Sequence, residues 1–260
     1  MGVEPLGMDS GTVNALRKTY SLPRVVALTG AGISAPSGVP TFRGKEGLWR
    51  QYDPQQLATP EAFARDPKLV WEWYDWRRQR IAACEPNAAH YTLVDMERTL
   101  PPGHMAIITQ NVDGLHQKAG SRNLLPLHGD IWSVRCMECG YRGEDRRVPL
   151  PEIPPHCPHC GGLLRPDVVW FGEALPYAVL NQAFAVVQAA DYMLVIGTSA
   201  VVQPAASLAT VAQRHGARLI VFNIEPTPLS DLADEEILGS VDETLPTWWA
   251  QTAARWGVSK

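Results

Sequence analysis

The chain has no long apolar run and little excess charge of either sign. No stretch approaches the roughly 20 consecutive apolar residues of a membrane-spanning helix. The N-terminal segment MGVEPLGMDS lacks the basic stretch and apolar run of a secretory signal, and Leu6 stands where a myristoylation signal needs Ser or Thr. These absences predict a cytoplasmic protein with no membrane association. A net charge of −4 and a pI near 6.0 argue against general attraction to nucleic acid, so we expect no direct nucleic-acid binding.

Internal repeats and low-complexity tracts are also absent, and the composition is that of a globular enzyme. With 260 residues and 45% hydrophobic content, the chain can bury one large core and a small satellite core. Short apolar runs without polar alternation are typical of strands that helices cover on both faces of a parallel sheet. Such runs occur at Val25–Thr29, Met105–Thr109, Leu124–Leu127, Tyr192–Gly197 and Arg218–Asn223. The sequence therefore predicts an α/β fold, a Rossmann-like doubly wound parallel sheet.

Two further segments depart from this pattern. Helical periodicity dominates between residues 60 and 100, and Pro60 and Pro67 mark expected helix starts. Residues 136–165 are rich in Cys, Gly and Pro, which predicts a small lobe that needs a metal to fold. We predict the first part of a Rossmann-like domain at 12–135, with an inserted helical module at about 40–100. The zinc-binding lobe then covers 136–165, and the second part of the Rossmann-like domain covers 166–260.

Four of the five cysteines follow the spacing C-x2-C-x17-C-x2-C, formed by Cys136, Cys139, Cys157 and Cys160. Two thiolates separated by two residues can hold one ion, and two such pairs complete the closed tetrahedral shell of a structural zinc site. Two disulfides or scattered buried thiols are the alternatives, but the absence of a secretory signal favours zinc. The remaining Cys84 has no neighbouring base, and we interpret it as a small buried hydrophobic residue.

A glycine turn follows the first apolar run, in the sequence VVALTGAGISA at residues 25–35, and matches G-x-G-x-x-A. Glycines at such a turn let backbone amides approach a pyrophosphate, although a turn of this kind is often only a tight connection. A dehydrogenase would also need an acidic residue at the end of the next strand, about 20 positions on. Asp53 is close to that position, but no convincing strand precedes it. Glu225 is the better candidate for an acid that binds ribose.

Several segments together resemble the sirtuins, the family of NAD-dependent protein lysine deacylases. Besides the two CxxC pairs, they are GAGISAPSGVPTFRG (30–44), TQNVDGLH (109–116), LHGD (127–130), RPDVVWFGE (165–173), GTSAVVQPAA (197–206) and FNIEP (222–226). The resemblance implies a large Rossmann-type domain, a small zinc-and-helix domain, and NAD consumed as a co-substrate in the cleft between them. It implies acylated-lysine proteins or peptides as the other substrate.

The resemblance also implies roles for particular residues. His128 would be the base that removes a ribose hydroxyl proton, as a group that titrates near neutral pH can do. His116 would support the active-site loop, while His90 and His104 are expected to be structural or exposed. NAD contacts are implied for Gly30, Ala31, Gly32, Ile33, Thr41, Phe42, Arg43, Gln110, Asn111, Asp113, Gly197, Thr198, Ser199, Asn223, Glu225 and Val241. Without the resemblance, Asn111 and Asp113 would be interpreted as caps of the following helix.

Residues expected to contact the substrate lie in two segments. Val168, Trp170, Phe171, Gly172 and Glu173 resemble the sirtuin strand that pairs with the substrate backbone, opposite Val201–Gln203; the alternative is an ordinary buried strand. Tyr74 and Arg77 are three residues apart in WEWYDWRR, so a phenol and a guanidinium share one helix face and could bind one carboxylate. The alternative is an aromatic helix with a solvated arginine.

The pair Tyr74 and Arg77 matches the Y-x-x-R motif of sirtuins that remove succinyl, malonyl or glutaryl groups, a class in which PTFRG is also typical. We therefore predict an NAD-dependent deacylase that removes succinyl and malonyl groups and retains deacetylation. A general deacetylase and a protein ADP-ribosyltransferase are the alternatives. A dehydrogenase and a zinc-ribbon binding module are more remote.

Overall fold

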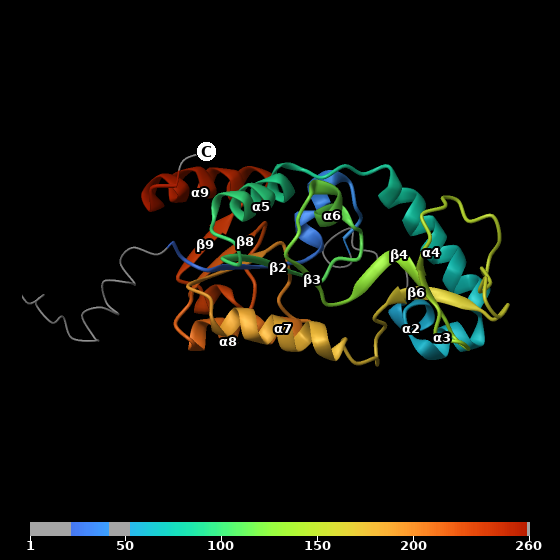
Figure 1. The fold of residues 1–260 in the computed structure, drawn as a ribbon. Coiled ribbons are helices and arrows are strands. Elements are labelled where there is room, and N and C mark those ends of the chain that lie inside the picture. Colours follow the sequence, from blue (N-terminus) through green and yellow to red (C-terminus); the bar gives the residue numbers. More distant parts are fainter. Residues whose placement is uncertain (1–21, 42–52, 259–260) are drawn as a thin grey trace, which may run out of the picture.

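The computed structural model describes residues 22–41 and 53–258, and a six-stranded parallel sheet dominates it (Figure 1). The strands are β1 (Val25–Thr29), β2 (Met105–Thr109), β3 (Leu124–Pro126), β7 (Tyr192–Ile196), β8 (Arg218–Asn223) and β9 (Glu235–Leu238). Their order in the sheet is β3-β2-β1-β7-β8-β9. This is the strand order of a Rossmann-type sheet, and it makes β1 and β7 neighbours although a long chain segment separates them.

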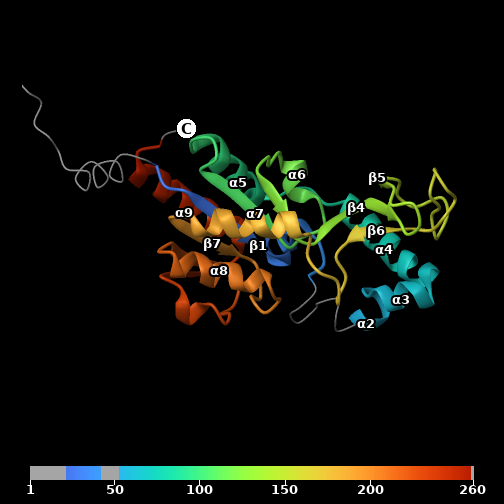
Figure 2. The same ribbon diagram turned by 60° about the horizontal axis from the view of Figure 1, so that its bottom comes forward.

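Helices cover both faces of this sheet. Helices α7 (Tyr177–Gln188) and α8 (Ala205–Arg214) pack on one face, and α5 (Ala88–Thr99) and α9 (Val241–Trp256) pack on the other (Figures 1 and 2). Alternate residues of β1 enter the two cores: Val26 and Leu28 face α7 and α8, whereas Val25 and Ala27 face α5 and α9. Because both faces are buried, the strand is apolar from Val25 to Leu28.

A second, smaller module lies beside the carboxyl ends of β1 and β2 (Figure 2). Its antiparallel sheet has the order β5-β4-β6 and consists of β4 (Gly129–Cys136), β5 (Arg142–Glu144) and β6 (Leu164–Val168). Helices α2 (Pro54–Leu57), α3 (Pro60–Arg65) and α4 (Pro67–Ala82) belong to the same module. Trp71 and Tyr74 of α4 share a buried cluster with Ile131 and Val134 of β4.

The helix starts predicted at Pro60 and Pro67 are confirmed. The side chains of Thr59 and Asp66 accept hydrogen bonds from the first-turn amides of α3 and α4, while each proline occupies a position that needs no donor. The short helix α6 (Leu115–Ala119) follows β2. None of the helices within residues 22–41 and 53–258 is long and apolar enough to cross a membrane.

The α/β fold class is confirmed, with small differences at the ends of two strands. The sheet contains all five predicted strands; β3 ends at Pro126 and β7 at Ile196, one residue earlier than predicted. Strand β9 was not predicted; its residues EEIL alternate between half-buried and exposed at the edge of the sheet. The division of the chain into domains stays a prediction, although α5, part of the predicted helical module, packs on the large sheet.

Candidate active site

Two glycine turns meet where β1 and β7 end side by side. The amide of Gly30 donates to the carbonyl of Ile196 at 3.0 Å, and the amide of Gly32 donates to the carbonyl of Gly197 at 2.7 Å. A Cβ on Gly32 would lie 2.7 Å from the Gly197 Cα, and Gly197 itself has a φ of +58°. Only glycine permits this approach. Open parallel sheets bind ligands at such a point, where successive connections leave the sheet in opposite directions.

A layer of polar side chains after β2 holds these turns in place. Gln110 Nε2 donates to Thr198 Oγ1 at 3.1 Å and so joins the β2 loop to the β7 turn. Asn111 Nδ2 donates to the carbonyl of Gly30 at 3.1 Å. Asp113 accepts from Ser34 Oγ and from the amide of Leu115, each at 2.8 Å. Asp113 therefore joins the first amide of α6 to Ser34, which follows the first glycine turn.

Two buried histidines lie beneath the polar layer. His116 Nε2 is 2.9 Å from Thr29 Oγ1, and the rings of His90 and His116 have their centroids 4.9 Å apart. Burial lowers the pKa of His116 to about 3 and that of His90 to about 4. Both rings are therefore neutral at physiological pH. His116 contacts the last residue of β1, and His90 packs against the ring of His116.

His128 lies between β3 and β4 and has a defined tautomer. Its Nδ1 is 3.0 Å from the carbonyl oxygen of Gln110. Because a carbonyl can only accept, Nδ1 carries the hydrogen and Nε2 retains its lone pair in the neutral ring. Burial lowers the pKa of His128, and the hydrogen bond to the Gln110 carbonyl opposes this more weakly. The ring is thus a neutral imidazole able to take up a proton.

A cavity of about 570 Å³ connects the glycine turns, His128 and the small module. Twenty of the site residues predicted from the sequence line it: Gly30, Ala31, Gly32, Thr41, Tyr74, Arg77, Gln110, Asn111, His128, Val168, Trp170, Phe171, Gly172, Glu173, Gly197, Thr198, Ser199, Asn223, Glu225 and Val241. Ile33 and Asp113 do not line it; both are buried. Phe42 and Arg43 lie outside the described residues.

Some lining residues were not predicted individually as site residues. They include Ala35, Pro36, Ala58, Trp73, Val112, Leu175, Ile224 and Ser240. Most are apolar or small, so nothing in their chemistry separates them from core residues. Trp73 precedes Tyr74 in an aromatic helix, and only the packing of α4 reveals that it also reaches the cavity.

The end of the cavity formed by the small module contains a phenol and a guanidinium from one helix. Tyr74 and Arg77 of α4 are 3% and 7% exposed. The Arg77 Cζ lies 4.8 Å from the centroid of the Trp73 ring and 5.7 Å from that of Tyr74. Burial lowers the pKa of Arg77 and raises that of Tyr74. An arginine nevertheless stays charged in proteins, so this end of the cavity holds a cation next to a neutral phenol.

The chain after β6 forms the opposite side of this end. β6 ends at Val168, and residues 169–173 continue as irregular structure and a turn rather than as part of a strand. The amide of Val169 donates to the carbonyl of His128 at 2.9 Å, and the amide of Phe171 donates to the carbonyl of Ala58 at 2.9 Å. These bonds fix the segment between the backbone of His128 and that of Ala58, which lies just before α3.

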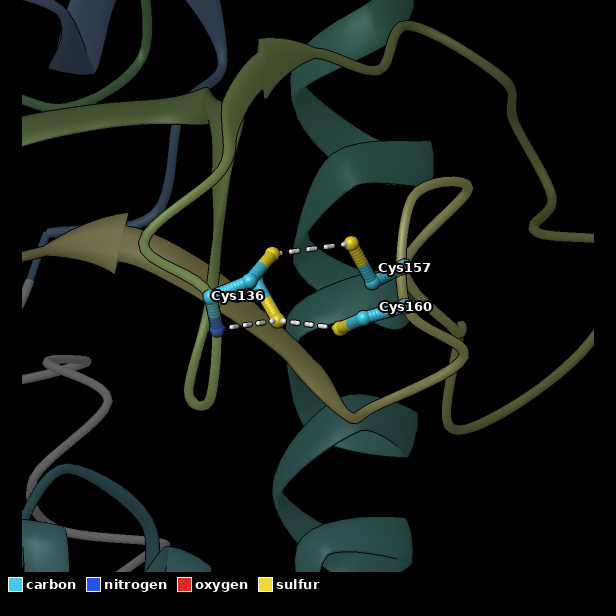
Figure 3. Close-up of side chains that lie close together, drawn as sticks. Cys136, Cys157 and Cys160 are labelled. Carbon is cyan, nitrogen blue, oxygen red and sulfur yellow. Dashed lines mark hydrogen bonds between the residues drawn. The ribbon is translucent and has the colours of Figure 1, made fainter.

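The four cysteines of the two CxxC pairs converge at the outer end of the small sheet (Figure 3). Their sulfur atoms all lie within 4.8 Å of one another, with 3.5 Å between Cys136 and Cys160 and 3.6 Å between Cys139 and Cys157. Four ligands about 2.3 Å from one zinc ion lie about 3.8 Å apart at the corners of a tetrahedron. The cluster is therefore consistent with a structural zinc. Cys84 is buried elsewhere, and burial raises the pKa of its thiol.

The two glycine turns lie at the strand ends where a Rossmann-type sheet binds its ligand, and the neutral imidazole of His128 lines the same cavity. This combination is typical of a nucleotide-dependent enzyme. The Sir2 family model matches residues 30–204. Over 81% of this chain and 87% of the relative, the sequence is 58% identical to an NAD-dependent protein deacylase of Aquifex aeolicus (strain VF5). The chain belongs to the Sir2 family.

Two solved structures extend this comparison to the ligands. A Sir2 homologue in complex with NAD is 46% identical, with a TM-score of 0.83 over 94% of each chain. A Sir2 complex with a p53 peptide and NAD⁺ is 33% identical, with a TM-score of 0.79 over 96% of this chain and 99% of that one. The protein is an NAD-dependent protein deacylase, and NAD is its co-substrate.

Proposed function

We propose that this deacylase removes succinyl and malonyl groups from lysine side chains and retains activity on acetyl-lysine. The observation that supports this proposal is the placement of Tyr74 and Arg77, which are buried on α4 and line the same cavity as His128. A lysine whose acyl group reaches α4 therefore brings the distal carboxylate of a succinyl or malonyl group next to a guanidinium and a phenol.

Electrostatics favours an acidic acyl group at this end of the cavity. Burial disfavours the charge of Arg77, and a carboxylate offsets that cost through a charge-assisted hydrogen bond. Such a bond contributes about 1.5–3 kcal/mol, which corresponds to roughly ten- to a hundredfold in kcat/KM. An acetyl group ends in a methyl and gains nothing comparable, so it is the weaker substrate.

We assign the other wall of the cavity to NAD. The fit is supported by the glycine turns at the strand ends, which line the cavity, and by the polar residues around them. The turns at 30–32 and 197–199 bind the phosphates, Gln110 and Asn111 the nearer ribose, Asn223 and Glu225 the adenosine ribose, and Val241 the adenine. NAD supplies a ribose carbon that accepts the acyl oxygen as nicotinamide leaves. His128 then takes a ribose hydroxyl proton on Nε2, while its Nδ1–H stays bonded to Gln110.

We propose that acylated-lysine peptides lie along residues 168–173, opposite Val201–Gln203. The side chains of Phe171 and Val201 are 40% and 47% exposed, so this part of the rim is open to a polypeptide. Backbone pairing with an extended peptide gives affinity with little dependence on its side chains.

The test incubates the enzyme with NAD and matched acetyl-, malonyl- and succinyl-lysine peptides, with mass spectrometry of all products. We expect O-acyl-ADP-ribose, nicotinamide and free lysine, with kcat/KM higher for the acidic acyl groups. Arg77→Met keeps an apolar stem and should lower succinyl-lysine kcat/KM by about ten- to a hundredfold, with acetyl-lysine activity held or raised. Arg80→Met, an exposed arginine on the same helix that does not line the cavity, is the matched control.

Two outcomes contradict the proposal. Parallel loss of both activities in Arg77→Met would make Arg77 structural and the protein a general deacetylase. ADP-ribose attached to the peptide or protein, with the acyl group still on lysine, would make it an ADP-ribosyltransferase.

A further inference from the structure

We infer that Trp170 is a positioning residue for the acidic acyl group, because its indole N–H fixes the Tyr74 hydroxyl as a donor toward a ligand in the cavity. The inference rests on the proposed function, since it concerns how the same site holds a carboxylate. Trp170 follows β6, whereas Tyr74 belongs to α4, and both line the cavity.

The two side chains share one buried hydrogen bond. Trp170 Nε1 lies 2.9 Å from the Tyr74 hydroxyl oxygen, and the two residues are 2% and 3% exposed. An indole N–H can only donate, so the phenol oxygen is the acceptor in this contact. The hydroxyl hydrogen of Tyr74 therefore points away from the indole. A carboxylate, which only accepts when ionised, is the complementary partner for that hydrogen.

The phenol keeps its hydrogen under working conditions. Burial raises the pKa of Tyr74 above its usual value of 10.0, and this outweighs the opposing effects of Arg77 and of the Trp170 hydrogen bond. A hydroxyl without a fixed neighbour could rotate and present either its hydrogen or its lone pairs to a ligand. The indole N–H of Trp170 prevents this rotation because it already donates to a lone pair of the Tyr74 hydroxyl oxygen. A neutral acetyl group ends in a methyl and makes no use of the donor.

Trp170 is itself held by charged contacts. The Arg165 Cζ lies 3.3 Å from the centroid of the Trp170 ring. Arg165 donates to both carboxylate oxygens of Glu173, at 2.7 and 2.9 Å, and to the carbonyl of Val168 at 2.9 Å. The same Glu173 accepts the Trp170 amide at 2.9 Å. The indole plane therefore cannot turn without disturbing a bidentate, largely buried ion pair.

The test removes the indole N–H and keeps an aromatic ring. Trp170→Phe should lower the ratio of succinyl-lysine to acetyl-lysine kcat/KM by about two- to tenfold, the range for one neutral hydrogen bond. The matched control is Trp71→Phe, on the same helix as Tyr74. Its equally buried indole donates to the carbonyl of Leu164 at 2.8 Å, so this variant should lose stability but keep the succinyl-to-acetyl ratio.

A double-mutant cycle separates positioning from packing. If Trp170 acts through the Tyr74 hydroxyl, Trp170→Phe should not lower the ratio further in a Tyr74→Phe background. Both substrates are measured on one preparation, so the ratio does not depend on the fraction of folded protein. A further drop in the Tyr74→Phe background, or equal losses for both substrates in Trp170→Phe, would overturn the inference.

The same measurements separate this inference from the proposed function. A wild-type enzyme with no preference for succinyl-lysine overturns both. A preference that Arg77→Met and Tyr74→Phe abolish, but Trp170→Phe leaves intact, overturns only the role of Trp170.

Discussion

The two walls of the cavity are built by different means. On the wall of the parallel sheet, backbone atoms meet directly: amides and carbonyls of residues 30–32 and 196–197 bond to each other, and glycine makes the approach possible. On the wall of the small module, side chains from α4 and from the segment after β6 interlock through Trp170, Tyr74 and Arg77. In the proposed function, the backbone wall binds the co-substrate NAD and the side-chain wall selects among acyl groups.

The largest expected effect concerns the metal, on which only the small module should depend. Cys139→Ser removes one of four ligands, and structural zinc contributes about 10 kcal/mol or more to the folding of small modules. We expect loss of one zinc per chain by metal analysis, loss of amide protection in β4 to β6 by hydrogen exchange, and undetectable deacylation. Protection in β1, β2 and β7 should remain.

The control for the metal is Cys84→Ala, which changes the one cysteine outside the cluster. This variant should keep its zinc and its activity. A Cys139→Ser protein that is folded and active without zinc would refute the structural role of the metal.

His128→Ala tests the chemistry at the junction of the two walls. Loss of a general base lowers turnover by about 100- to 10,000-fold, while calorimetry should show NAD binding close to that of the wild type. Nicotinamide exchange should survive, because it precedes the step that needs the base. His104→Ala, a histidine that does not line the cavity, is the control. Near-normal deacylation by His128→Ala would remove His128 from this role.

Acid should destabilise the wall of the parallel sheet through its two buried histidines. Their pKa values in the folded protein are about 3 for His116 and about 4 for His90, against about 6.5 in an unfolded chain. Below pH 6.5 the unfolded chain binds more protons, so stability is fully present above that pH and falls toward pH 4. Over this pH range, each histidine lowers the free energy of unfolding by about 1.4 kcal/mol for each pH unit of acidification.

Denaturant unfolding measures this acid effect. Between pH 7 and pH 5 the two histidines together should lower the free energy of unfolding by about 2–4 kcal/mol. His90→Gln should show roughly half of this dependence, and the difference from the wild type isolates one ring from the titration of carboxylates. An identical pH dependence in both proteins would mean that His90 is protonated in the folded state.

The smallest expected effect concerns the glycine contact. A Cβ on Gly197 would lie 2.4 Å from the Ile33 amide nitrogen, at a φ that disfavours side chains. Gly197→Ala should cost about 1–3 kcal/mol of stability and raise the KM for NAD. Gly216→Ala also has a positive φ but meets nothing within 4 Å, so it separates backbone strain from close approach. Equal costs in both variants, with KM for NAD unchanged, would contradict the importance of the contact.

The backbone wall was easier to predict from the sequence than the side-chain wall. Strands buried on both faces give uninterrupted apolar runs, and glycine turns give recognisable sequence motifs. The local sequence therefore predicted β1, β2, β7 and β8 and the turns at 30–32 and 197–199. The strands of the small sheet were not predicted, because β5 has only three residues, two of them exposed, and β4 contains a register irregularity.

The contacts within the side-chain wall depend on tertiary packing. Spacing on a helix placed Tyr74 and Arg77 on one face, but no local pattern could bring Trp170 to Tyr74 from the other side of the cavity. Asp113 was predicted from its motif to contact NAD. In the structure it bonds to Ser34 and to the amide of Leu115 and does not line the cavity, so its contact with NAD stays a prediction.

The pairing of β1 with β7 also has a consequence for folding during synthesis. Gly32 and Gly197, which a hydrogen bond joins, are far apart in sequence and are therefore synthesised at different times. Contacts of such long sequence separation carry a large loop-closure cost and form late. The contact between the two glycine turns therefore cannot form until most of the chain has been made. The residues of the cysteine-rich sheet lie closer together in sequence and are all made before that point, so the cysteine cluster can form before the glycine contact does.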